Sequence, residues 1–234
     1  MSETADLHVL RVFCDRHGRA GNHLGVFLDG HAIEVSERQG IAAQLGFSET
    51  VFVQDRHTGT LAIHTPTQEL PFAGHPLVGT AWLLSQSDHP PVVLRPPAGE
   101  VQFALEDELV WVRARPEYSP SWDQVQLDDP AAVLALDGPP GALGHVQAWA
   151  WQDHHSGVIR ARVFAPDYGV GEDPATGSAA IMLCATIERE LRIIQGPDGA
   201  ESEIHVRPLA GGWVRLGGRV IADHELAQNL TRAR

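Results

Sequence analysis

Short apolar runs rich in branched residues dominate the hydrophobic pattern of the chain, and such runs are typical of β-strands. The predicted strands cover residues 7–14, 51–54, 60–65, 92–94, 100–105, 109–113, 144–151, 157–165, 203–207 and 213–221. The stretch between the two groups, residues 115–140, is rich in Pro and Asp and predicts a linker. We therefore expect two halves, residues 1–115 and 116–234, with room for the last strand to pack back on the first half.

Three segments predict helices. The first covers residues 37–45, where Ser36 and Gln39 fit a capping box and Gly46 supplies the stop. The other two are expected to begin at Pro76 and Pro174 and to end near residues 84 and 190, because proline is favourable at the first helical position.

The segments around these two prolines resemble each other. Residues 75–81 read His-Pro-Leu-Val-Gly-Thr-Ala, and residues 173–179 read Asp-Pro-Ala-Thr-Gly-Ser-Ala, at an offset of 173 − 75 = 98. Each segment also follows a predicted strand that ends in proline. Two such matches indicate an internal duplication, and the alternative is two unrelated helix starts that obey the same capping rules.

Two helix N-termini related in this way would form an anion site in a cleft between the halves. Their N–H groups lack intrahelical partners and carry partial positive charge, which suits a small carboxylate. His75 and Asp173 would flank this site, and Ser178 would add a hydroxyl. Taken singly, Asp173 is also compatible with a plain N-cap and His75 with a surface loop residue.

Glu49 is unusual because strand alternation places it on one face with Val51 and Val53. A carboxylate on an apolar face costs free energy unless it is protonated or paired. Desolvation favours its protonated form, which suits proton transfer near neutral pH. The alternative interpretation is a strand-edge glutamate that extends into solvent.

Composition narrows the possible functions. The 234 residues carry a formal net charge of −13, which disfavours nucleic acid and anionic membrane as partners. All 17 basic residues are Arg, so the Lys chemistry of pyridoxal-phosphate enzymes and phosphate loops is excluded. The 13 His residues show no metal-ligand spacing, and we expect no metal.

The two cysteines, Cys14 and Cys184, lie in apolar stretches and are expected to be buried free thiols. Residues 1–6 show no signal-peptide pattern, and no apolar run is long enough to span a membrane. A cytoplasmic location is therefore expected.

Three sequence blocks resemble the motifs of a known protein family. They are Phe-Ser-Glu-Thr-Val-Phe-Val at residues 47–53, Glu-Leu-Pro-Phe-Ala-Gly-His-Pro at 69–76 with Gly-Thr-Ala at 79–81, and Arg-Val-Phe-Ala-Pro at 162–166 with Glu-Asp-Pro-Ala-Thr-Gly-Ser-Ala at 172–179. Their order and spacing are similar to those of the PhzF family of phenazine-biosynthesis proteins, within the diaminopimelate-epimerase superfamily.

The resemblance implies an α+β fold of two similar halves, in each of which a curved β-sheet wraps around a central helix. It also implies a homodimer that isomerises a small carboxylate-bearing substrate without a cofactor, as trans-2,3-dihydro-3-hydroxyanthranilate isomerases do. Glu49 would be the general acid/base. The other implied site residues are His75, Asp173 and Ser178 for catalysis, and Gly74 and Gly177 for the substrate carboxylate.

Departures from the family pattern bear on the substrate. The family's Gly-Asn-Pro reads Gly-Asn-His at residues 21–23, which leaves Asn22 as a weaker substrate contact, and residues 195–200 replace a later family block. An amino-acid or hydroxyproline-type epimerase is one alternative, although the two helix starts lack the Cys pair of such enzymes. A catalytically idle relative that binds a metabolite or a partner protein is the other.

Overall fold

The computed structural model of the protein describes residues 6–141, 144–168 and 170–232. These residues form fifteen β-strands and five α-helices, divided between two compact units. The first unit is Met1–Val12, His23–Val112 and Val220–Arg234, and the second is Phe13–Asn22 and Arg113–Arg219. The chain changes unit four times, after Val12, Asn22, Val112 and Arg219. Residues 13–22 therefore belong to the second unit and residues 220–234 to the first.

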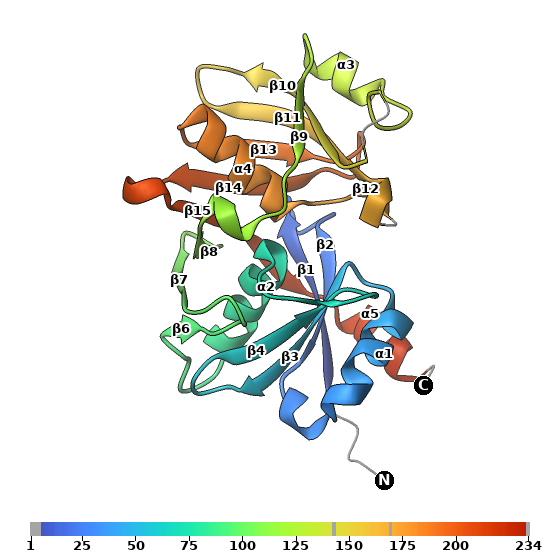
Figure 1. The fold of residues 1–234 in the computed structure, drawn as a ribbon, viewed down its shortest axis with the longest axis vertical. Coiled ribbons are helices and arrows are strands. Elements are labelled where there is room, and N and C mark those ends of the chain that lie inside the picture. The colour runs from blue at the N-terminus through green and yellow to red at the C-terminus, as the bar shows by residue number, and fades with distance from the viewer. Residues whose placement is uncertain (1–5, 142–143, 169, 233–234) are drawn as a thin grey trace. The chain divides into compact units, whose positions relative to one another are not determined.

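The first unit contains a twisted sheet and three helices (Figure 1). Its strand order is β5 (Glu69–Leu70), β4 (Thr60–His64), β3 (Glu49–Asp55), β2 (Asn22–Phe27) and β1 (Leu7–Cys14). β2 and β3 are parallel, whereas β3, β4 and β5 are antiparallel. A second antiparallel ribbon consists of β6 (Val93–Leu94), β7 (Val101–Glu106) and β8 (Leu109–Ala114). The helices are α1 (Val35–Leu45), α2 (Gly74–Ser85) and α5 (His224–Arg232).

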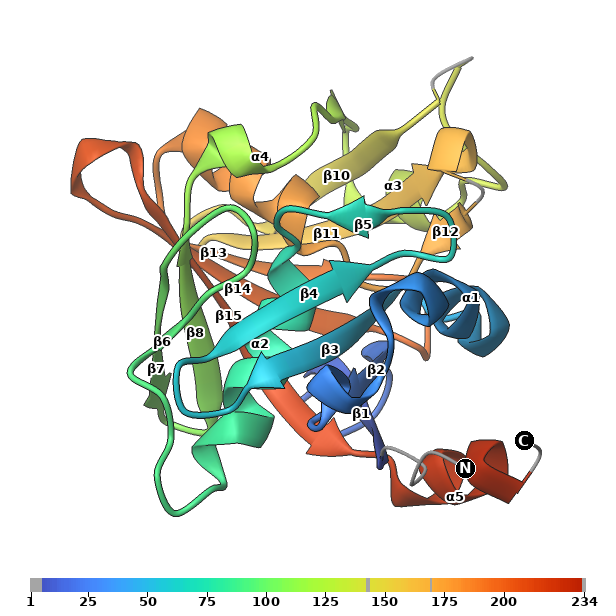
Figure 2. The ribbon, with the colours of Figure 1, turned by 60° about the horizontal axis from the view of Figure 1, so that its bottom comes forward.

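Helices cover both faces of this sheet. One face carries an apolar cluster that includes Phe27 and Phe52, and side chains of α1 and α5 pack against it. Figure 2 shows α1 beside the ends of β3 and β4. Because successive strand residues point to opposite faces, Glu49, Val51 and Val53 face away from that cluster, toward α2. The helix α2 is buried over most of its length, so it is the central helix of the first unit.

The second unit also has a sheet and a buried helix, but its strand order differs. The order is β14 (Ser202–Pro208), β13 (Leu191–Gln195), β11 (Val158–Ala165), β10 (Val146–Asp153) and β9 (Asp123–Gln126). In addition, β12 (Val170–Asp173) pairs with β11, and β15 (Val214–Ala222) pairs with β14. The pairs β9–β10 and β11–β13 are parallel. The buried helix α4 (Gly177–Ile187) packs against β14, and α3 (Pro130–Leu134) packs against β10 and β11. The expected α+β class, with a central helix in each half, is confirmed.

The helices begin at other residues than predicted. The first helix starts at Val35, with Glu34 as its N-cap and no side-chain cap, so the predicted capping box at Ser36 is wrong. Since Ser36 already lies inside the first turn, its hydroxyl is not at the capping position. The predicted stop is confirmed, because Gly46 adopts φ 67° and its N–H bonds to the carbonyl of Ala42 at 3.2 Å.

The 98-residue repeat does not match equivalent helical positions. Pro76 is the third residue of α2, whereas Pro174 precedes α4, which begins only at Gly177. The helix starts are therefore offset by 177 − 74 = 103 residues. Gly79, which the sequence match pairs with Gly177, lies in mid-helix, where an added Cβ would come within 2.5 Å of Leu24 Cδ2. Gly79 thus serves close packing of α2 against the sheet.

Residues 115–140 are not a linker. They contain a 3-10 turn at Pro116–Tyr118, the strand β9 and the helix α3. Asp129 caps α3 by accepting a hydrogen bond from Ala132 N at 2.8 Å, and Pro130 occupies the first turn. The Asp and Pro residues that suggested a linker are therefore helix-start signals here. Five strands of the structure were not predicted from the sequence: β2, β5, β9, β12 and β13.

A pair of glycine substitutions tests the packing role of Gly79. Gly79→Ala should lower the free energy of unfolding by about 1 kcal/mol, because overpacking costs about 1–3 kcal/mol and improved helix propensity returns about 0.5–1 kcal/mol. Gly40→Ala is the matched control in α1, where no atom lies within 4 Å of an added Cβ. It should raise the free energy of unfolding by about 0.5–1 kcal/mol. Denaturant unfolding of both variants measures the difference, and equal signs would contradict it.

Candidate active site

Glu49 and His75 form a close pair in the first unit. Glu49 opens β3, where it lies opposite Leu24 of the parallel neighbour β2. His75 is the second residue of α2. Its Nδ1 lies 2.9 Å from Oε2 of Glu49, and the two side chains are only 5% and 17% exposed. The interpretations of Glu49 as a solvent-exposed strand-edge residue and of His75 as a surface loop residue are therefore wrong.

The second nitrogen of His75 fixes where a proton must lie. Nε2 of His75 is 3.3 Å from the backbone carbonyl oxygen of His23, and a carbonyl only accepts hydrogen bonds, so Nε2 carries hydrogen. Nδ1 lies at an ion-pair distance of 2.9 Å from a carboxylate oxygen, and a further proton on one of the two groups is needed to avoid repulsion between their lone pairs. Either His75 is cationic beside ionised Glu49, or it is neutral beside protonated Glu49. Both states hold one proton that can be transferred.

His23, which departs from the family's proline, contributes more than its carbonyl. Its ring stacks on Phe47 with centroids 5.9 Å apart, and its Nε2 lies 3.5 Å from Oδ2 of Asp223. Burial lowers the pKa of His23 below its usual value, against the opposing effect of the Asp223 carboxylate; the cations of Arg11 and His75 lower this pKa further. His23 therefore favours its neutral form beside the Glu49–His75 pair.

In the second unit, neutral donors hold the carboxylate of Asp173 at the end of β12. Nδ2 of Asn22 donates to Oδ1 at 2.9 Å, and Oγ1 of Thr176 donates to Oδ2 at 2.6 Å. Both carboxyl oxygens thus accept a hydrogen bond from a neutral side chain. The N-cap of α4 is Thr176, so the interpretation of Asp173 as a plain N-cap is wrong.

Gln195 fixes the loop that carries Asp173, a role that sequence reasoning missed. Its side chain is fully buried at the end of β13. Nε2 donates to the Asp173 carbonyl at 2.8 Å and to Thr176 Oγ1 at 2.9 Å, while Oε1 accepts from Thr176 N at 3.2 Å. The available signal was a polar residue directly after the apolar pair Ile193 and Ile194.

Each central helix begins at a predicted glycine. The first helical hydrogen bonds run from Leu77 N to the Ala73 carbonyl and from Ala180 N to the Thr176 carbonyl, so the N–H groups of Gly74 and Gly177 precede them. The backbone N–H groups at such a start have no intrahelical partner and can bind an anion. Ser178 is the second residue of α4, and its Oγ accepts a hydrogen bond from Nε1 of Trp122 at 3.0 Å.

The predicted site residues thus form two groups, one in each unit. Glu49, Gly74 and His75 lie together in the first unit. Asn22 and Asp173 are hydrogen-bonded in the second unit, where Gly177 and Ser178 open α4 close to Thr176 in the chain. The first group carries a proton that can be transferred, whereas the second carries a hydrogen-bonded carboxyl group, a hydroxyl and the N–H groups of a helix start.

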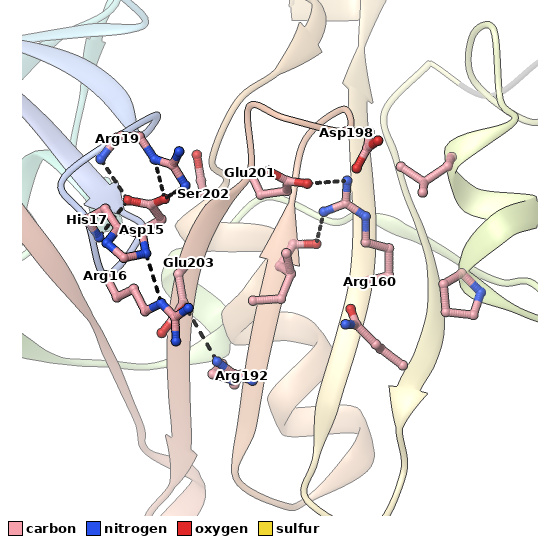
Figure 3. A pocket seen from close by; sticks show the side chains of 14 residues that line it. Asp15, Arg16, His17, Arg19, Arg160, Arg192, Asp198, Glu201, Ser202 and Glu203 are labelled. Atoms are coloured by element: carbon pink, nitrogen blue, oxygen red, sulfur yellow. Dashed lines mark hydrogen bonds and ion pairs between the residues drawn. The ribbon is translucent and has the colours of Figure 1, made fainter.

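A separate groove of about 550 Å³ lies in the second unit and contains none of the predicted site residues (Figure 3). Its charges are largely paired: Arg19 with Asp15 at 2.9 Å, Arg192 with Glu203 at 3.5 Å and Arg160 with Glu201 at 3.8 Å. Arg160 also donates to the Gly196 carbonyl at 2.6 Å. The block at residues 195–200, which departs from the family pattern, therefore contributes to the rim of this groove through Asp198.

Both cysteines are buried free thiols, as predicted. Cys184 lies within α4, where burial raises its pKa to about 12. Cys14 lies in β1 and is 1% exposed. Neither residue is at the start of a central helix, so neither occupies the position of the Cys pair of two-thiol epimerases.

No group of three or more His, Cys, Asp or Glu side chains among the described residues could hold a metal ion. None of the described helices is both long enough and apolar enough to cross a membrane.

Comparison with known proteins gives consistent matches. The family model for phenazine biosynthesis-like proteins, PhzC-PhzF, matches residues 10–136 and 136–206. The trans-2,3-dihydro-3-hydroxyanthranilate isomerase of Pseudomonas aeruginosa is 30% identical over 82% of this chain and 86% of its own length. The enzyme of the same name from Pseudomonas chlororaphis is 31% identical over 75% of this chain and 80% of its own length.

Solved structures support the fold. A PhzF-family phenazine biosynthesis protein from Bacillus anthracis has a TM-score of 0.75 at 17% identity, covering 92% of this chain and 96% of that chain. A hydroxyproline epimerase from Agrobacterium vitis has a TM-score of 0.55 at 12% identity, covering 95% of this chain and 92% of that chain. These likenesses concern the fold alone, and both support the α+β architecture described above.

Replacing Gln195 tests its hold on the Asp173 loop. Gln195→Leu should lower the free energy of unfolding by about 2–4 kcal/mol, because it leaves buried groups of Asp173 and Thr176 without their partner. Gln54→Leu, at an exposed position of β3, is the control and should change the free energy by less than about 0.5 kcal/mol. Denaturant unfolding gives both values. Equal stability of the two variants would show that the loop does not depend on Gln195.

The burial of the cysteines predicts inert thiols. The native protein should not react with an aromatic disulfide reagent at pH 8, since the reactive thiolate is suppressed in Cys184 and access to both thiols is blocked. The same protein in denaturant should release two equivalents, one for each cysteine. Rapid labelling of the native protein would contradict this prediction and reopen thiol chemistry.

Proposed function

The chain belongs to the PhzC-PhzF family of phenazine biosynthesis-like proteins and is a PhzF-like isomerase; we propose that it moves a proton on a small carboxylate-bearing metabolite, with Glu49 as the general acid/base. The observation that supports this proposal most directly is the 2.9 Å contact between Glu49 and His75. A general acid/base must hold a proton that it can give up and take back. The pair holds one such proton in either of its two states.

The proposed reaction has two proton transfers. Ionised Glu49 first removes a proton from a C–H bond of the substrate, and the electron pair of that bond enters the substrate's conjugated system. Protonated Glu49 then gives the proton to a different carbon, where an electron pair of the conjugated system forms the new C–H bond. Nothing is oxidised or reduced, and Glu49 returns to its ionised form. His75 donates its Nδ1–H to the Glu49 carboxylate while that carboxylate is charged.

The second group of residues is proposed to bind the substrate. In the second unit, the N–H groups that open α4 at Gly177 suit a carboxylate, and in the first unit the N–H groups that open α2 at Gly74 have the same chemistry. Asp173 is held by neutral donors and suits a cationic or hydrogen-bond-donating substituent. Because the Pseudomonas relatives are named for trans-2,3-dihydro-3-hydroxyanthranilate, a ring that carries both a carboxylate and an amino group, this compound is the first substrate to test.

Exchange in deuterated water tests the proposal. The wild-type protein should incorporate solvent deuterium at a ring carbon of this compound, or of another small unsaturated carboxylic acid in a panel, as followed by NMR. A protein that binds such acids tightly but catalyses no exchange would be an idle relative, and the proposed isomerisation would be wrong.

Glu49→Gln should keep the fold and substrate binding but lower the exchange rate about 10²–10⁴-fold, because an amide cannot accept a proton at neutral pH. Single-turnover exchange measures this change with the acid that the wild type turns over. Glu37→Gln, on the exposed surface of α1, is the control and should leave the rate unchanged. Equal rates for wild type and Glu49→Gln would mean that another group carries the proton.

A further inference from the structure

Trp122 contacts a proposed site residue from a segment without any family motif. It directly precedes β9, and its Nε1 donates to Oγ of Ser178 at 3.0 Å. The side chain is partly buried, in a region where the sequence predicted only a linker. The contact joins residues 56 positions apart, so the fold and not the local chain creates it.

The chemistry of the two groups fixes the direction of this hydrogen bond. An indole N–H can only donate, whereas a serine hydroxyl can both donate and accept. Ser178 must therefore accept from Trp122, and its single O–H must point to another acceptor. Among the described residues, the Ser178 hydroxyl donates to none. At the second position of α4, beside free helix N–H groups, an acceptor on an anionic ligand is the fitting partner.

Several contacts within the second unit hold Trp122 in place. The next residue, Asp123, donates its N–H to the His145 carbonyl at 3.2 Å. The His145 ring meets the Trp122 ring edge to face, with centroids 5.9 Å apart and planes at 85°. The far end of β9 is tied by Leu127 N to the Trp149 carbonyl at 2.8 Å. The strand thus fixes the indole in space before any ligand binds.

We propose that Trp122 is a positioning residue that orients the Ser178 hydroxyl as a hydrogen-bond donor to a carboxylate or other anionic oxygen of the substrate. The proposal rests on the proposed function, because it assumes that Ser178 contacts the substrate. It assigns to the indole N–H a role that the ring's apolar surface could not fulfil. Removing only the N–H therefore separates this role from simple packing.

A double-mutant cycle tests the proposal. Trp122→Phe keeps an aromatic ring but loses the N–H, and it should lower kcat/KM about 2- to 10-fold, mainly through a higher KM. Ser178→Ala should lower kcat/KM at least as much. In the Ser178→Ala background, Trp122→Phe should have no further effect, because the hydroxyl that it orients is absent. Equal fold-losses in both backgrounds, or no loss in either, would overturn the proposal.

Two controls make the outcome specific. Trp213→Phe removes an indole elsewhere in the second unit, where the ring lies against Arg113 at 4.2 Å, and it should leave kcat/KM unchanged. The second control measures the Kd of the carboxylic acid that the wild type turns over. Glu49→Gln protein binds this acid without turnover, and its Kd is compared with and without Trp122→Phe. A 2- to 10-fold weaker Kd supports the role of Trp122, and an unchanged Kd overturns it. If Glu49→Gln exchanges protons like the wild type, the proposed function fails, whatever the cycle shows.

Discussion

A carboxylate that is partly removed from water needs a proton, a cation or several hydrogen-bond donors, and the structure around both central helices depends on this constraint. The two units satisfy it in different ways. Glu49 is paired with His75, a group that can itself take or release a proton. Asp173 is held by Asn22 and Thr176, whose neutral groups do not titrate. The carboxyl group of the first unit therefore has a partner that can exchange a proton with it, whereas the two described side-chain partners of Asp173 in the second unit only donate hydrogen bonds.

This difference also explains which supporting residues the site needs. The mobile proton is defined because a backbone carbonyl occupies the far nitrogen of His75, which leaves Nδ1 to face Glu49. The carboxyl group of Asp173 needs a rigid loop, and Gln195 holds this loop with three hydrogen bonds from a fully buried side chain. The carbonyl of His23 and the amide of Gln195 are thus as important for the geometry as the groups that they orient.

The sequence was informative where local patterns decide structure. Strand alternation placed Glu49 on the apolar face of β3, and apolar contexts identified Cys14 and Cys184 as buried. The sequence did not predict where the two central helices begin. Pro76 and Pro174 both suggested helix starts, yet Pro76 lies inside α2 and Pro174 lies before α4. Proline is tolerated throughout the first turn, so its position does not define the starting residue. The 98-residue match followed from that ambiguity and not from equivalent positions.

The pairs that define the site could not be predicted from spacing, because sheet topology creates them. Glu49 and His75 are 26 residues apart (75 − 49), and they meet because α2 lies against the face of β3 on which Glu49 points. Trp122 reaches Ser178 because β9 pairs in parallel with β10, and the ring of His145, the residue directly before β10, contacts the indole. A segment rich in Asp and Pro therefore positions a donor for the site, since those residues end strands and cap α3 where they had suggested a linker. Polar composition alone does not separate a linker from a segment whose caps and short strand place one aromatic side chain, and only the hydrogen-bond partners of that side chain decide between them.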